Sequence, residues 1–73
     1  MKTLDTKGLN CPLPVLKAKK ALQGMNPGEA LTVLATDPSV RKDFKAFCEA
    51  TGHHLVAIAE AGGVYTVTVR KSA

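Results

Sequence analysis

The chain has 73 residues, 45% of them hydrophobic and 22% charged, with a formal net charge of +4. A chain this short buries only a thin core, so we expect one domain over residues 1–73 and no deep substrate cavity. Two cysteines are too few for a disulfide-built secreted fold, and no apolar run approaches the roughly 20 residues of a membrane span. Residues 1–6 lack the apolar segment of a signal peptide, so we expect a cytoplasmic protein with no membrane partner.

The first half of the chain predicts a strand, a helix and a second strand. A strand is expected at residues 2–6, and a helix at residues 12–24. Glycine and proline in residues 24–28 form a turn that ends the helix. Residues 30–36, which are rich in leucine and valine, are the second expected strand.

The second half predicts another helix and a hairpin. Asp37 followed by proline is typical of a helix N-cap, and we expect the helix to end near Thr51, before a glycine. Residues 54–59 and 64–70 are predicted as strands of an antiparallel hairpin. The last strand alternates apolar and polar residues, which predicts a sheet with one buried face. The expected fold is therefore an α/β (α+β) two-layer sandwich of order βαβαββ, with a four-stranded mixed sheet and two helices on one face.

The main candidate for chemistry is Cys11, which begins the motif Cys11-Pro12-Leu13-Pro14. Proline is tolerated in the first turn of a helix, so Pro12 and Pro14 are expected to support a helix start with Cys11 at or beside the N-cap. The helix dipole favours a thiolate there. Because the two prolines leave Leu13 as the main N–H donor, we expect only a modest depression of the thiol pKa, which suits reversible sulfur exchange.

The second cysteine, Cys48, lies on the apolar stripe of the second predicted helix, beside Phe44 and Phe47. This setting indicates a structural role, and the alternative is a second thiol that resolves a bond formed at Cys11. Free cysteine is among the most buried residue types, which favours the structural interpretation.

Several other chemistries are not expected. The residue three positions after Cys11 is Pro14, so the chain has no C-x-x-C dithiol. His53 and His54 open the third predicted strand, at the end of the sheet away from Cys11, which disfavours a Cys–His dyad. The cysteine and histidine spacing matches no zinc pattern, so we expect no metal site.

The surface beside Cys11 is predicted to carry apolar and basic side chains. Leu13 and Leu16 fall away from the buried stripe of the first helix. Lys19 and Lys20 are by default a solvated charged face, although basic residues beside two exposed leucines resemble a docking rim. If the first two strands are parallel, Asp37 adjoins Cys11, and its carboxylate either caps the helix or recognises a partner. No aromatic residue is interleaved with the basic ones, so direct nucleic-acid binding is not expected.

The segment from Leu4 to Val15 resembles the L-D-x-x-G-x-x-C-P-x-P signature of the TusA/SirA sulfur carriers, and Asp37-Pro38 and Arg70-Lys71 also fit. The resemblance implies that Cys11 accepts sulfane sulfur as a persulfide from a cysteine desulfurase or a rhodanese-type donor. An acceptor protein would then receive the sulfur, for tRNA thiolation, a sulfur-oxidation relay or molybdenum cofactor supply. The resemblance thus implies a sulfurtransferase in the sense of a persulfide carrier, with no cofactor except the transient sulfur.

The same resemblance assigns roles to individual residues. It makes Cys11 the persulfide-bearing thiol and places Lys19 and Asp37 at positions of contact with sulfur donors. Lys19 replaces an arginine of the best-known member, and lysine lacks the bidentate fork of arginine. Leu13 replaces a glutamate of the same member. We expect Leu13 and Leu16 to form the surface that contacts partners, and we expect the protein to be a monomer. The alternative function is a non-catalytic regulatory or RNA-binding module in which Cys11 is structural.

Overall fold

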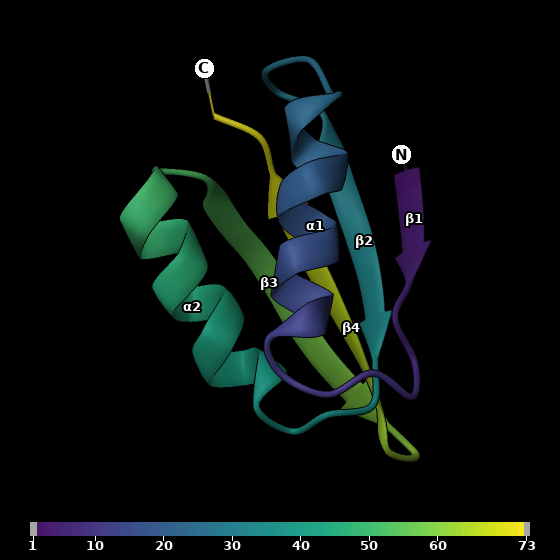
Figure 1. Ribbon diagram of the computed structural model, residues 1–73. Coiled ribbons are helices and arrows are strands. Elements are labelled where there is room, and N and C mark those ends of the chain that lie inside the picture. The colour runs from purple at the N-terminus through teal and green to yellow at the C-terminus, as the bar shows by residue number, and fades with distance from the viewer. Residues whose placement is uncertain (1, 73) are drawn as a thin grey trace.

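The computed structural model describes residues 2–72. In chain order its elements are β1 (Lys2–Asp5), α1 (Leu13–Gln23), β2 (Ala30–Ala35), α2 (Val40–Thr51), β3 (His54–Ala61) and β4 (Val64–Arg70). The strands form one sheet of order β1-β2-β4-β3, and Figure 1 shows both helices on the same side of it. The predicted two-layer βαβαββ sandwich is confirmed.

The sheet is mixed, as expected. β1 pairs in parallel with β2, and Leu4 lies beside Val33. β4 pairs antiparallel with both β2 and β3, so that Val67 lies between Val33 and Ile58. Because β1 and β2 are parallel, the helices that follow them both begin at the same end of the sheet, seen at the bottom of Figure 1.

The core lies between the sheet and the two helices. Val40, Phe44 and Cys48 recur at the spacing of one helix face, and all three are buried, with Phe44 0% and Cys48 5% exposed. The structural interpretation of Cys48 thus agrees with its burial. The helices and the inner sheet face bury the following apolar residues: Ala18, Leu22, Met25, Leu31, Val33, Ala35, Val40, Phe44, Cys48, Val67 and Val69.

The ends of several elements differ from the prediction by one to three residues. The first helix begins at Leu13 rather than residue 12, and the second begins at Val40 rather than directly after Asp37. Strand β3 continues to Ala61, beyond the predicted end at residue 59. The stop of α2 was predicted correctly, because Gly52 adopts the left-handed conformation (φ +83°) and its N–H donates to the Cys48 carbonyl at 2.9 Å. Among residues 2–72, neither helix combines the length and apolar character that a membrane crossing requires.

Candidate functional site

The β1–α1 loop is held against the β2–α2 loop by hydrogen bonds. Thr6, only 1% exposed, donates its hydroxyl to the Leu34 carbonyl at 2.6 Å, and its backbone N–H donates to the same oxygen at 2.7 Å. The Gly8 N–H then donates to Thr36 Oγ1 at 2.9 Å. Gly8 has φ +85°, a conformation that glycine adopts without a Cβ clash. These bonds continue the β1–β2 pairing past the strands and fix the path of the chain toward Cys11.

Asp37 connects this loop to the start of α2. Its Oδ2 accepts the Cys11 backbone N–H at 2.7 Å, and its Oδ1 accepts the Ser39 N–H at 2.9 Å. The bonds from Ser39 and from Cys11 hold the pKa of the Asp37 carboxyl below its ordinary value, so the group is ionised at neutral pH. The predicted neighbourhood of Cys11 and Asp37 is confirmed.

The predicted N-cap role of Asp37 needs a correction. The N-cap residue of α2 is Ser39, whose side chain makes no capping hydrogen bond. Asp37 begins the turn just before the helix, and its backbone carbonyl accepts the Val40 N–H at 3.1 Å. Its side chain accepts the Ser39 N–H in the manner of an Asx turn. The proline after Asp37 therefore opens this turn rather than the helix itself.

The start of α1 does not form the predicted environment of the thiol. Pro12 is the N-cap, and its carbonyl accepts the Leu16 N–H at 3.0 Å, so Pro14 is the second helical residue. Cys11 lies beside the cap, exposed, with a cis peptide bond to Pro12. The Leu13 N–H, which we expected to face the thiol, donates to the Asn10 carbonyl at 2.9 Å. The main donor expected from the sequence is therefore engaged by a carbonyl instead of the sulfur.

Two carboxylates raise the pKa of the thiol instead. A side-chain hydrogen bond with Asp43 is the main cause that raises the pKa of the Cys11 thiol above its ordinary value, followed by partial desolvation. The negative charges of Asp43 and Asp37 act in the same direction, and the positive charge of Lys42 opposes them more weakly. The predicted depression of the Cys11 pKa is therefore wrong, because Asp43, desolvation and Asp37 all raise this pKa.

Sequence reasoning missed Asp43 and Lys42. Asp43 lies in the first turn of α2, half-buried, with its backbone N–H donating to the Ser39 carbonyl at 2.9 Å. The signal was present in the predicted topology, because a loop that brings Cys11 to Asp37 also brings it to the first turn of α2.

The two leucines of α1 lie where the helical period placed them. Leu13 is 44% and Leu16 is 52% exposed, whereas Ala18 on the opposite face is buried. Lys19 is exposed farther along α1 and lines a small hollow of about 170 Å³ with residues of α2, among them Phe47. The structure thus brings Cys11 together with Asp37, and it places Lys19 about two helical turns beyond the thiol.

The histidines lie at the other end of the sheet, as predicted. His53 precedes β3, and its Nδ1 accepts the Ser72 backbone N–H at 3.1 Å. No group of three or more histidine, cysteine, aspartate or glutamate side chains within residues 2–72 is arranged to hold a metal ion.

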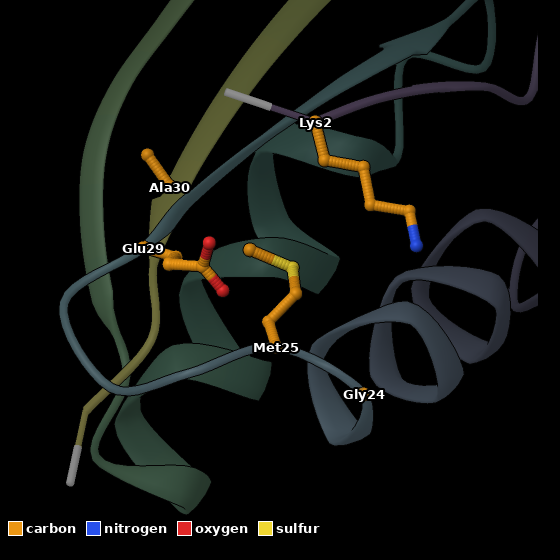
Figure 2. A pocket seen from close by; sticks show the side chains of 5 residues that line it. All are labelled: Lys2, Gly24, Met25, Glu29 and Ala30. Carbon is orange, nitrogen blue, oxygen red and sulfur yellow. The ribbon is translucent and has the colours of Figure 1, made fainter.

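A larger hollow, of about 430 Å³, also lies away from the thiol. It adjoins the C-terminal end of α1, and Figure 2 shows its lining, with Lys2 from β1 and Met25 and Glu29 from the turn after α1. Glu29 Oε1 accepts the Asn26 N–H at 2.6 Å, so this carboxylate already stabilises the turn. Neither hollow contains Cys11. The candidate site is the exposed Cys11 thiol, whose backbone N–H donates to Asp37.

Comparison with known proteins agrees with this fold. Residues 2–71 match the family described as Sulfurtransferase TusA. The chain is 51% identical over 69 residues to the sulfur carrier protein TusA of Allochromatium vinosum, covering 94% of this chain and 91% of that protein. It is 46% identical over 70 residues to TusA of Pseudomonas paraeruginosa, covering 96% and 89%. The crystal structure of a SirA-like protein from Desulfitobacterium hafniense superposes with a TM-score of 0.85 at 32% identity, covering 100% of both chains.

The fold and the site thus define a class of small proteins, two-layer α+β sandwiches with an exposed cysteine just before the first helix. The chain belongs to the TusA family of sulfur carriers.

Proposed function

We propose that this protein carries sulfane sulfur as a persulfide on Cys11, between a sulfur donor and an acceptor protein in the cytoplasm. The observation that carries the proposal is the contrast between the two thiols, since Cys11 is exposed and Cys48 is buried. A cysteine within reach would attack the persulfide and release the sulfur as sulfide while forming a disulfide. Burial of Cys48 in the core supports retention of the sulfur on Cys11.

The transfer is a thiol exchange at sulfur. The Cys11 sulfur attacks the terminal sulfur of a donor persulfide, the S–S bond of the donor breaks, and the donor departs as a thiol. The balanced reaction is Cys11–SH + R–S–SH → Cys11–S–SH + R–SH, and it needs no further oxidant. Delivery is the same step in the other direction, with an acceptor thiol as the attacking group.

The donor in this proposal is a cysteine desulfurase or a rhodanese-type protein, and the acceptor serves tRNA thiolation or a sulfur-oxidation relay. Either partner must bring a sulfur atom to Cys11, so its contact surface includes the neighbouring helix α1. Leu13 and Leu16 are exposed there, which supports a docking role for both. Asp37 contributes through the loop that it anchors, and Lys19 through the charged edge of α1.

The experiment incubates the protein with a cysteine desulfurase and cysteine, and separately with a rhodanese and thiosulfate. Intact mass under non-reducing conditions is expected to show one added sulfur atom on the wild type and on Cys48→Ser, and none on Cys11→Ser. If a folded wild-type protein accepts sulfur from neither donor, the carrier proposal is wrong, and the non-catalytic module becomes the better interpretation. If Cys48→Ser is the variant that fails to gain the sulfur, then Cys48 carries it and the proposal for Cys11 is wrong.

A further inference from the structure

We propose that Thr36 is a positioning residue of the sulfur transfer, whose hydroxyl oxygen holds the loop that carries Cys11 so that the thiol is aligned with the sulfur of a docked protein donor. This inference rests on the proposed persulfide function and concerns the geometry of its transfer step. Thr36 lies outside the Cys-Pro-x-Pro motif, in the segment that joins β2 to α2.

Two consecutive turns carry Cys11. The Leu9 N–H donates to the Thr6 carbonyl at 3.1 Å and closes the first turn. The Leu13 N–H donates to the Asn10 carbonyl at 2.9 Å and closes the second, in which Cys11 is the second residue. The position of the thiol therefore depends on how these two turns are held against the rest of the fold.

A backbone N–H of each turn donates to a side chain of the β2–α2 segment. In the first turn the Gly8 N–H donates to Thr36 Oγ1 at 2.9 Å, and in the second the Cys11 N–H donates to Asp37 Oδ2 at 2.7 Å. Figure 1 shows the two segments next to each other at the same end of the sheet. Two residues separate Gly8 from Cys11, so a shift of the first turn is passed on to the thiol within a short length of chain.

Thr36 differs from the other residues that hold this loop. Thr6 is 1% exposed and Asp37 also accepts the Ser39 N–H, so substitutions at those two positions disturb the fold as well as the loop. Thr36 is exposed, and its bond from Gly8 lies at the surface, where water can replace a lost acceptor. Removal of the Thr36 hydroxyl is therefore expected to loosen the loop without unfolding the protein.

The transfer step depends on alignment when the donor is a protein. A docked protein fixes the direction of its own persulfide, so the Cys11 sulfur must already lie in line with the S–S bond that breaks. A small donor such as glutathione persulfide can instead turn to meet the thiol wherever it lies. A loop that is ordered before docking therefore accelerates transfer from the protein donor in particular.

Thr36→Val tests this role, because it keeps the shape of the side chain and removes the acceptor oxygen. Single-turnover loading is measured over a range of concentrations of a cysteine desulfurase that carries a persulfide. The maximal loading rate is expected to fall at least about tenfold, since misplacement by about 1 Å can cost on the order of a hundredfold. The desulfurase concentration that gives half the maximal rate is expected to stay unchanged, because the docking surface is intact.

Two further reagents report on the thiol itself. Alkylation by iodoacetamide and loading from glutathione persulfide are both expected to stay within about twofold of the wild-type rates in Thr36→Val, since neither reagent needs a fixed direction of attack. A role of Thr36 in folding alone would not separate these rates from the rate with the desulfurase.

Thr36→Ser keeps the hydroxyl and is expected to restore the maximal rate. Thr36→Ala also lacks the acceptor and provides a second variant if Thr36→Val does not fold. Thr3→Val is the matched control, because Thr3 is likewise an exposed threonine but lies on β1, and it is expected to load at the wild-type rate.

If the variants without the hydroxyl load from the desulfurase at the wild-type maximal rate, or if Thr36→Ser is as slow as Thr36→Val, the inference is wrong. An equal loss with glutathione persulfide and iodoacetamide would also contradict it, because that loss would reflect a change in the thiol and not in its alignment. If wild-type protein gains sulfur from neither a desulfurase nor a rhodanese, the proposed carrier function itself fails, and that result is distinguishable because it does not involve Thr36.

Discussion

The backbone N–H of Cys11 donates a 2.7 Å hydrogen bond to Asp37 Oδ2, which joins the loop before α1 to the loop before α2. Parallel pairing of β1 and β2 makes this bond possible, because both loops leave the same end of the sheet. The backbone at Cys11 is therefore held by a residue that lies 26 positions away in the sequence. Proteins commonly place reactive groups on loops that a rigid sheet supports, and this site follows that arrangement.

Asp37→Asn is expected to weaken this connection. An asparagine offers one acceptor oxygen, so it can accept from Ser39 or from Cys11 but not from both as the carboxylate does. We expect a lower urea midpoint for unfolding and slower sulfur loading, both of which are measurable on the purified variant. Asp37→Ser retains a cap acceptor for the turn, and full activity in that variant would show that the Cys11–Asp37 bond is dispensable.

The same carboxylate predicts part of the acid sensitivity of the fold. The pKa of Asp37 is lowered from its ordinary value of 3.8, so its contribution to stability is fully present above that value. The contribution is lost as the pH falls below 3.8, through the folded-state pKa. Urea unfolding measured from pH 6 to pH 3 (about the range in which carboxylates titrate) is expected to show a smaller decline for Asp37→Ser than for the wild type. An identical decline in both proteins would contradict the pKa assignment.

A third prediction concerns the reactivity of the two thiols. The pKa of Cys11 is raised, whereas that of Asp37 is lowered. The pKa of Cys11 is raised above 9.0, so its alkylation rate is expected to keep rising as the pH passes 9.0. Burial raises the pKa of Cys48 and also blocks access to it, so Cys48 is expected to react only after unfolding. Peptide mapping after brief iodoacetamide treatment measures both rates. A plateau of Cys11 alkylation below pH 9.0 would show that the carboxylates do not control the thiol.

The fold was largely predictable because it depends on short-range patterns. The spacing of Val40, Phe44 and Cys48 identified the buried face of α2, and the alternation in β4 identified the inner face of the sheet. The same reasoning placed Leu13 and Leu16 on the surface. These patterns depend only on the period of a helix or a strand, which the chain displays directly.

The electrostatics of the site were not predictable in the same way. They depend on which N–H groups are already engaged in hydrogen bonds. The Leu13 N–H, for example, donates to the Asn10 carbonyl rather than facing the sulfur. They also depend on Asp43, which raises the pKa of the Cys11 thiol from another element, the first turn of α2. Such contacts depend on tertiary geometry, and the local motif around Cys11 contains no trace of them.

Phe44 offers a test of the core beneath the site. It is 0% exposed, and Phe44→Ala is expected to lower the free energy of unfolding by about 3–5 kcal/mol, as buried aromatic truncations do. Phe44→Leu keeps most of the volume and is expected to cost less. Urea unfolding followed by circular dichroism measures both variants. A loss below about 1 kcal/mol for Phe44→Ala would mean that this part of the core can collapse around the cavity.

The proposed docking role of Leu13 and Leu16 predicts a difference between protein donors and small donors. Leu16→Ser is expected to slow loading from a cysteine desulfurase by about tenfold, or about 1.4 kcal/mol of docking free energy. It is expected to leave loading from glutathione persulfide unchanged, since that donor needs no docking surface. Val56→Ser is the matched control, because Val56 is 50% exposed, close to the 52% of Leu16, but lies on β3. Equal effects of the two substitutions would remove the case for a docking role of α1.

The location of the carried sulfur tests the central claim most directly. A cysteine desulfurase loads the protein from free cysteine that carries a sulfur isotope label. The product is then alkylated, digested without reductant and examined by tandem mass spectrometry. The label is expected on the peptide that contains Cys11, as an alkylated persulfide, with the Cys48 peptide unlabelled. Label on Cys48, or no label on either peptide after loading attempts with both a desulfurase and a rhodanese, would contradict the assignment of this protein as a persulfide carrier through Cys11.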